Sequence, residues 1–177
     1  TDGQGTAESL ISGNVGPVIN VNDAPTGAVV IAGTVTEDQT LTADTSTITD
    51  GDGLGAFTYQ WVRSTDGGAT WSAIAGATTS TYTLGDADVG NLIHVSVGYS
   101  DRQGSAESLT SVSVGPVVNV NDAPMLTTNS LSLGQGDILT LGASDLSASD
   151  VDSGPATLTF SVSNVVHGHF EFSSAPG

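Results

Sequence analysis

The 177-residue chain contains no cysteine and no lysine, and Arg63 and Arg102 are its only basic side chains besides three histidines. Without cysteine, no disulfide can hold the fold together. Without lysine, neither a phosphate-binding P-loop nor a Ser-Lys catalytic dyad can form. A formal net charge of -17 would repel nucleic acid, so we expect no nucleic-acid partner. Hard divalent cations remain the natural counter-charge.

Long apolar segments are missing as well. No run approaches the ~20 consecutive apolar residues that span a bilayer, and the first residues lack the basic and then apolar pattern of a secretion signal. We therefore expect no membrane insertion and no self-contained export signal. Apolar residues also show no sustained helical spacing, so the sequence predicts almost no helix beyond a single turn near residues 86–90.

The chain contains an internal repeat. Residues 1–25 align with residues 100–124 at an offset of 99, and 18 of these 25 positions are identical. Self-similarity at a fixed period indicates a tandem array. We expect residues 1–22 to be the terminal strand and linker of a preceding repeat, and residues 23–121 to be one full unit. Residues 122–177 do not resume the text of that unit, so we expect an incomplete second kind of module there.

Apolar and polar residues alternate within the full unit. Phe57, Tyr59 and Trp61 alternate with Thr and Gln, and the segment 93–99 alternates in the same way. A period of two is typical of half-buried strands, and Asp-Gly-Gly at 66–68 predicts a hairpin turn. Short strands and regular turns over about 100 residues indicate an all-β, immunoglobulin-like β-sandwich, with Trp61 in its core.

One short text occurs twice where units meet. Asn-Val-Asn-Asp-Ala-Pro stands at residues 20–25 and again at 119–124. An extended Asn-x-Asn places two amide oxygens on one side, the next Asp adds a carboxylate, and Pro fixes the direction of the chain. This arrangement predicts half of a calcium site. Asn and Asp are also ordinary turn formers, because their side chains bond their own backbone, and that alternative stays open.

The repeated text resembles the Asp-x-Asn-Asp-Asn-x-Pro linker of cadherins, in which calcium ions stiffen the join between successive domains. Asn20 and Asn119 stand where cadherins have Asp, and Ala24 and Ala123 stand where they have a second Asn. The resemblance therefore implies tandem cadherin-like or immunoglobulin-like sandwich modules with fewer or weaker ions than cadherins hold.

The same resemblance implies ligands from the domains on both sides of a linker. Glu37 is similar in placement to an early Glu of cadherin domains, and two Asp-x-Asp pairs resemble the paired acids of the family. Two Asp at i and i+2 can point the same way from a strand end and share one ion. The candidate metal ligands are Asp2, Asn20, Asn22, Asp23, Glu37, Asp50, Asp52, Asp101, Asn119, Asn121, Asp122, Asp150 and Asp152.

More broadly, the repeats look like those of large bacterial RTX adhesins, which are exported by type I secretion. The later text NSLSLGQGD and LSASDVDSG is similar to the opening of the cadherin-like repeats of chondroitin sulfate proteoglycans. These resemblances imply a secreted structural extender at the cell surface, with bound calcium and with neighbouring repeats as its partners. Such an extender would support cell adhesion or biofilm formation.

Two other functions compete with this hypothesis. Trp71 follows a turn and is flanked by Thr and Ser, which favours either a sugar-stacking platform for a glycan ligand or simple packing. Enzymatic motifs fail: no Gly-x-Ser-x-Gly elbow is present, and the EF-hand pattern that begins at Asp50 has Trp61 where a Glu is needed. We expect no enzyme. Asp86 and Asp88 are expected to close the loop before the strand that begins at Leu92.

Overall fold

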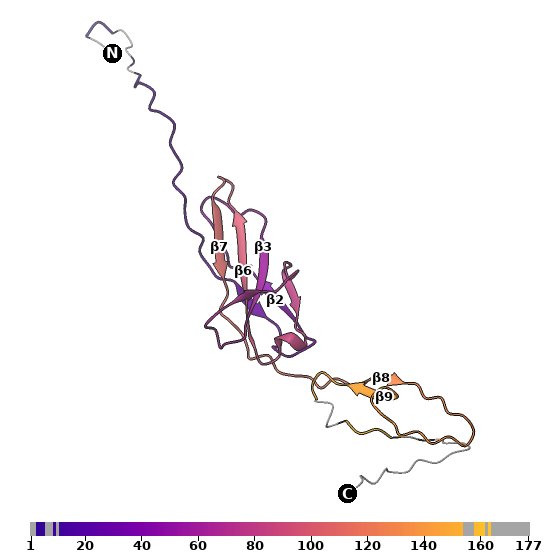
Figure 1. The fold of residues 1–177 in the computed structure, drawn as a ribbon. Coiled ribbons are helices and arrows are strands. Elements are labelled where there is room, and N and C mark those ends of the chain that lie inside the picture. The colour runs from indigo at the N-terminus through magenta and orange to yellow at the C-terminus, as the bar shows by residue number, and fades with distance from the viewer. Residues whose placement is uncertain (1–2, 6–8, 10, 154–157, 162, 164–177) are drawn as a thin grey trace.

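The computed structural model describes residues 3–5, 9, 11–153, 158–161 and 163, and over these the protein is all-β (Figure 1). Its strands are β1 (Val30–Ala32), β2 (Thr40–Asp44), β3 (Thr58–Ser64), β4 (Ser72–Ala73), β5 (Thr81–Thr83), β6 (Leu92–Ser100), β7 (Ala106–Thr110), β8 (Met125–Asn129) and β9 (Leu146–Ser149). In the described part of the chain, one 3-10 turn, η1 (Asp86–Asp88), lies where the sequence predicts it. Over the same ranges, the chain forms no helix with the length and apolarity that crossing a bilayer requires.

Two antiparallel sheets pack face to face as a β-sandwich. One sheet has the strand order β1-β2-β5 and the other has the order β4-β3-β6-β7. Every second residue of β6 from Ile93 to Tyr99 is buried, and Leu41 and Ala43 alternate in the same way on β2. Side chains on a strand point alternately to its two faces, so this burial confirms the period of two in the sequence. The prediction of an all-β sandwich is confirmed.

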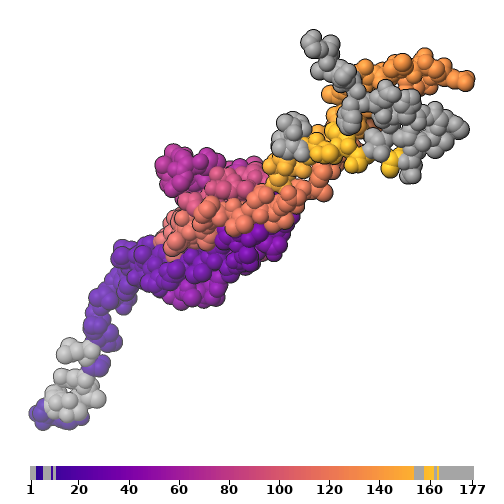
Figure 2. All heavy atoms as spheres, turned by 90° about the horizontal axis from the view of Figure 1, so that it is seen from below, coloured from indigo at the N-terminus to yellow at the C-terminus, as the bar shows by residue number. Residues whose placement is uncertain are grey.

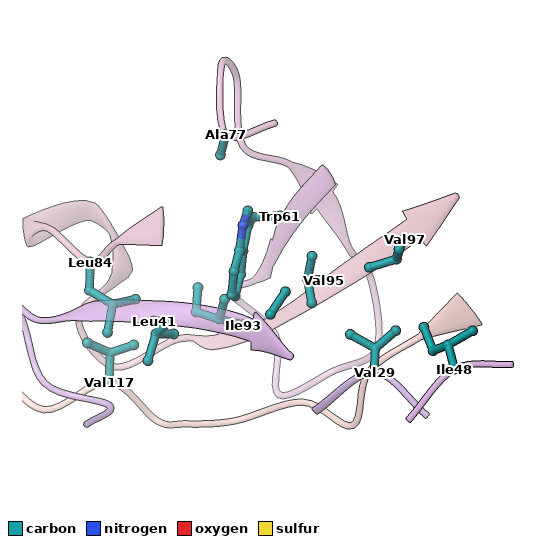
Figure 3. Close-up of a cluster of buried hydrophobic side chains, with 11 residues drawn as sticks. Val29, Leu41, Ile48, Trp61, Ala77, Leu84, Ile93, Val95, Val97 and Val117 are labelled. Atoms are coloured by element: carbon teal, nitrogen blue, oxygen red, sulfur yellow. The ribbon is translucent and has the colours of Figure 1, made fainter. Parts of the chain in front are cut away.

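The core lies between the two sheets around Trp61. This residue is fully buried in β3 and packs with Leu41 and Ile93 from both sheets (Figure 3). Its indole N–H donates to the carbonyl of Thr79 at 2.9 Å, which satisfies the only polar group of the side chain. Its ring also contacts Tyr82 at a centroid separation of 5.7 Å. The expectation that Trp61 occupies the core is therefore confirmed.

The segment after β7 brings the second linker to Glu37. Val117 is buried in the core, and the next residue, Val118, forms a parallel bridge with Thr36. The Glu37 N–H then donates to the Val118 carbonyl at 2.9 Å. Because this pairing ends at the start of the linker, it fixes the linker beside the Glu37 side chain.

The two copies of the repeated text lie in different surroundings. Val117 of the second copy is 3% exposed, whereas its counterpart Val18 is 97% exposed in the extended residues 11–21. Figure 2 shows this segment leaving the sandwich as a single extended stretch, at the end opposite to β8 and β9. The two linkers therefore meet the sandwich at its two opposite ends.

The described part of the second module is a strand pair with two turns. β8 and β9 pair antiparallel, with an irregular register between Leu126 and Thr128. Between them, the N–H of Gly134 and that of Gly142 each donate to an Asp carboxylate three residues later, both at 3.0 Å. The division of the chain near residues 22 and 121 stays a prediction.

Candidate functional site

Among the residues that the structure describes, carboxylates gather at two places. In each group, one carboxylate oxygen from each of three residues lies within 4.8 Å of the others. We name these groups by position. The N-terminal cluster consists of Asp50, Asp52 and Asp101, and the junction cluster consists of Glu37, Asp122 and Asp152. The sequence predicts all six as candidate ligands, and the fold brings them together from distant parts of the chain.

The N-terminal cluster joins two loops of the sandwich. In the first loop, the Asp52 N–H donates to Asp50 Oδ1 at 2.8 Å. In the second loop, Asp101 Oδ1 accepts hydrogen bonds from the N–H groups of Gln103 and Ser105, both at 2.8 Å. These contacts with nearby backbone N–H groups fix the orientation of the carboxylates, as is typical of Asp in tight turns.

Tyr99 anchors the N-terminal cluster to the core. Its hydroxyl donates to Asp50 Oδ2 at 2.5 Å, and its ring makes an edge-on contact with Phe57 at a centroid separation of 5.5 Å. Burial, the hydrogen bond to Asp50 and the nearby acidic charges raise the pKa of Tyr99. The hydroxyl therefore keeps its proton and remains a donor to Asp50 at neutral pH.

The junction cluster connects the sandwich, the linker and the second module. Glu37 is 1% exposed, and its Oε2 accepts a hydrogen bond from the Val120 N–H at 3.0 Å. The Asp122 N–H donates to Asp152 Oδ2 at 2.5 Å. Each of the three parts of the chain therefore contributes one carboxylate to the same small volume.

The same backbone contact occurs at both linkers. The Asp23 N–H donates to Asp52 Oδ2 at 2.7 Å, which repeats the contact of Asp122 with Asp152. In both loops, the second Asp of the Asp-x-Asp pair also donates its N–H to the first, at 2.8 Å in one and 2.9 Å in the other. The two modules differ in sequence, yet each presents the same loop to the same linker text.

Each cluster contains a buried oxygen that accepts no hydrogen bond. In the part of the chain that the structure describes, these atoms are Glu37 Oε1 and Asp101 Oδ2. Glu37 is 1% exposed and Asp101 is 6% exposed, so water has little access to either side chain. A buried polar atom without a partner is costly, and such atoms are rare in folded proteins. A bound cation would satisfy both oxygens.

Comparison with known proteins places the sandwich in a family. Residues 31–120, about half of the chain, match the family described as "Domain of unknown function (DUF8696)". The chain belongs to the DUF8696 family. None of the curated proteins compared with it matches. The DUF8696 match includes Glu37 and the whole N-terminal cluster, and it ends before Asp122 and Asp152.

Asp86 of the DUF8696 domain adjoins the junction cluster. The sequence does not predict this position, because it places Asp86 in the loop before β6. The Val120 N–H lowers the pKa of Glu37, but the facing carboxyl of Asp86, burial and nearby charges together raise it. Burial and the charges of Asp86 and Asp152 likewise raise the pKa of Asp122. These carboxylates repel one another at close range. A divalent cation bound between them would attract all of them and so offset this repulsion.

The expectation that Asp86 and Asp88 both close their loop holds only for Asp88. Asp88 Oδ1 forms an ion pair with Arg63 at 2.9 Å, and its Oδ2 accepts hydrogen bonds from the Tyr82 hydroxyl at 2.7 Å and the Gly85 N–H at 3.0 Å. Asp86 instead lines the hollow at the junction. In a 3-10 turn of three residues per turn, side chains two positions apart point in different directions.

The remaining predicted ligands lie in or beside the linkers. Asn119 lines the junction hollow with Asp86 and Asp152. The Asn22 amide donates to Glu107 Oε1 at 2.7 Å, and the Asn121 amide donates to the Asp122 carbonyl at 2.8 Å. The Asn22 amide therefore ties the first linker to β7, whereas the Asn121 bond lies within the second linker. Asn20 is exposed, Asp150 orients Asp152 through its hydrogen bond, and Asp2 lies outside the described residues.

Trp71, the candidate sugar platform of the DUF8696 domain, packs against His94. The ring centroids are 4.1 Å apart and the ring planes are inclined by 36°. The imidazole therefore covers part of the indole, and Trp71 itself is only partly exposed. This geometry favours packing over the flat, open face on which a sugar would stack.

The contact between Trp71 and His94 predicts a fluorescence change with pH. Burial lowers the pKa of His94 below its ordinary 6.5. Because an imidazolium quenches a neighbouring indole, Trp71 emission is expected to fall as the pH drops through a midpoint below 6.5. The neutral imidazole is favoured in the folded state, so this group's contribution to stability is present above pH 6.5 and is lost on acidification.

His94→Gln provides the control for this titration. It removes the titrating ring and should abolish the fluorescence transition, while the buried Trp61 continues to emit. A wild-type midpoint at or above 6.5 would show that His94 is not buried as described.

Proposed function

We propose that this DUF8696 chain is a non-enzymatic extender in which calcium ions hold successive sandwich modules in line. The observation that carries the proposal is the junction cluster, where the sandwich, the linker and the next module each supply one carboxylate. The buried oxygen Glu37 Oε1 of this cluster has no hydrogen-bond partner among the described residues. Ca²⁺ takes six to eight oxygen ligands, and carboxylates, amide carbonyls and water are its usual donors.

The junction offers more oxygens than the three of the cluster. Asp86 faces Glu37 from η1, and Asn119 lines the same hollow. An ion here would be held by groups from both modules, so its binding would restrict their relative motion. Without the ion, the crowded carboxylates would push the modules apart.

The N-terminal cluster supports a second ion of the same kind. Its loops belong to one sandwich, and the Asp23 N–H ties the first linker to Asp52. Asp101 Oδ2 is the buried oxygen that such an ion would satisfy. A repeat built this way carries an ion at each end, which suits a rod assembled from many copies.

We further propose that the parent protein is a secreted, RTX-type surface adhesin in which these repeats project a binding domain from the cell. Residues 11–21 are exposed and repeat much of the text of residues 110–120, in which Ser111 and Val117 are buried against the sandwich. This likeness supports a terminal strand that completes a preceding repeat. An extracellular site also suits weak ions, because extracellular modules bind calcium at roughly 10⁻⁴ to 10⁻³ M.

Calorimetry with and without calcium tests the proposal. At about 1 mM calcium, each ion should stabilise the fold by about 0.4–1.4 kcal/mol, which raises the unfolding midpoint by on the order of 2–10 °C over its value in chelator. Glu37→Gln removes one charged ligand of the junction cluster, so this variant should lose part of that increase.

Asp44→Asn is the matched control for Glu37→Gln. Asp44 is exposed on β2 and accepts a hydrogen bond from the Ser46 N–H at 2.9 Å, outside both clusters. The change removes the same charge and should leave the calcium response intact. An equal calcium response in wild type and in Glu37→Gln would refute the proposed role of the junction cluster.

A further inference from the structure

Arg102 is held beside the N-terminal cluster without pairing with it. Among the described residues, the one ion pair within 4.0 Å joins Arg63 to Asp88, so Arg102 neutralises no carboxylate by direct contact. The backbone N–H of Arg102 donates to the Gly53 carbonyl at 3.2 Å. The side chain then lies across Gly53, where an added Cβ would come within 2.9 Å of Arg102 Cδ and 3.3 Å of Nε.

The position of Arg102 next to the cluster follows from the chain itself. Arg102 comes directly after Asp101, and the Gly53 that it covers comes directly after Asp52. The Arg102 side chain, which follows the loop of Asp101, thus lies over the loop that carries Asp50 and Asp52. Arg102 is exposed, and its positive charge therefore belongs to a residue that adjoins Asp101 in sequence and contacts the loop of Asp52.

The first copy of the same loop lacks this charge. Thr-Asp-Gly-Gln-Gly at residues 1–5 aligns with Ser-Asp-Arg-Gln-Gly at residues 100–104, so Gly3 is the counterpart of Arg102. The Asp, Gln and second Gly are identical in the two copies. The repeat therefore exists in a form with a positive charge at this position and in a form without one.

We propose that Arg102 sets the affinity of the N-terminal cluster for calcium by repelling the ion. The proposal rests on the proposed function, because it assumes that this cluster binds a divalent cation. Repeats with Arg at this position bind calcium more weakly than repeats with Gly. Successive repeats of one array would then fill at different calcium concentrations, and the array would stiffen in steps.

Arg102 has the opposite effect when no ion is bound. Its charge then offsets part of the repulsion among Asp50, Asp52 and Asp101. A single substitution should therefore change two measurements in opposite directions. Arg102→Gln should lower the unfolding midpoint in chelator and should raise the affinity for calcium. A residue that merely packs against Gly53 would not produce both effects.

The test is calorimetric titration of calcium into the full chain. Asp152→Asn is introduced first to weaken the junction cluster, so that the heat comes mainly from the N-terminal cluster. Adding Arg102→Gln should then lower the Kd about two- to five-fold at low salt, and the difference should shrink as added salt screens the charge. Arg102→Gly should act like Gln, whereas Arg102→Lys keeps the charge and should bind as Arg102 does.

The outcomes separate this proposal from the one on which it rests. Unchanged or weaker calcium binding in both Arg102→Gln and Arg102→Gly would overturn the role of Arg102 and leave the calcium site standing. No calcium binding by wild type or by any variant would overturn the proposed function, and the role of Arg102 with it. The expected result is tighter calcium binding in Arg102→Gln and Arg102→Gly, but not in Arg102→Lys.

Discussion

Asp88→Ala is expected to lower the free energy of unfolding by about 3 kcal/mol, with or without calcium. The Asp88 side chain is 2% exposed and is the acceptor for Arg63, the Tyr82 hydroxyl and the Gly85 N–H. Its removal leaves all three donors without that acceptor. The Arg63 side chain is 28% exposed, so water compensates in part and the loss should lie at the lower end of the range for a broken buried pair.

Asp86→Ala is the matched control, because Asp86 lies in the same 3-10 turn two residues earlier. Its carboxyl faces Glu37 at the crowded junction, so its loss should leave stability in chelator unchanged or slightly higher. The same change should reduce the stabilisation that calcium provides. Urea unfolding in chelator and in millimolar calcium measures both effects. Equal losses for the two variants in chelator would refute the separate roles of Asp86 and Asp88.

The sandwich could be predicted from the sequence because its signal is local. Alternation along residues 93–99 assigns one face of β6 to the core, and the structure buries that face. Trp61 could be placed in the same way, since it continues the alternation of Tyr59 on β3. The pairing of the two sheets depends on long-range packing, which no local pattern encodes.

The acids of the two clusters could be predicted from the sequence, but their grouping could not. The repeated linker and the Asp-x-Asp pairs single out Asp122 and Asp152 as residues near a junction. Glu37 joins them because the chain after β7 forms a parallel bridge with Thr36, and that bridge puts Glu37 beside the linker. Such a bridge leaves no sequence pattern of its own.

The sequence does not predict Asp86 at the junction, because Asp88, two residues later, has the more typical role of an acid in such a loop. An acid before a strand is typical of loop closure, and Asp88 fills that role through Arg63. With one acid pointing into the sandwich, the acid two residues earlier in a 3-10 turn must point elsewhere, and here that direction is the junction. The spacing of the two acids was therefore a usable signal once the turn was known.

The most direct test of the account measures the distance between the two modules. The chain has no cysteine, so Ser108→Cys on β7 and Asn129→Cys on β8 provide two exposed sites for spin labels. If calcium bridges the junction, the distribution of distances between the labels should be narrow in millimolar calcium and broad in chelator. Adding Glu37→Gln should broaden it even with calcium present. An equally wide distribution with and without calcium would contradict the claim that the ion stiffens the join.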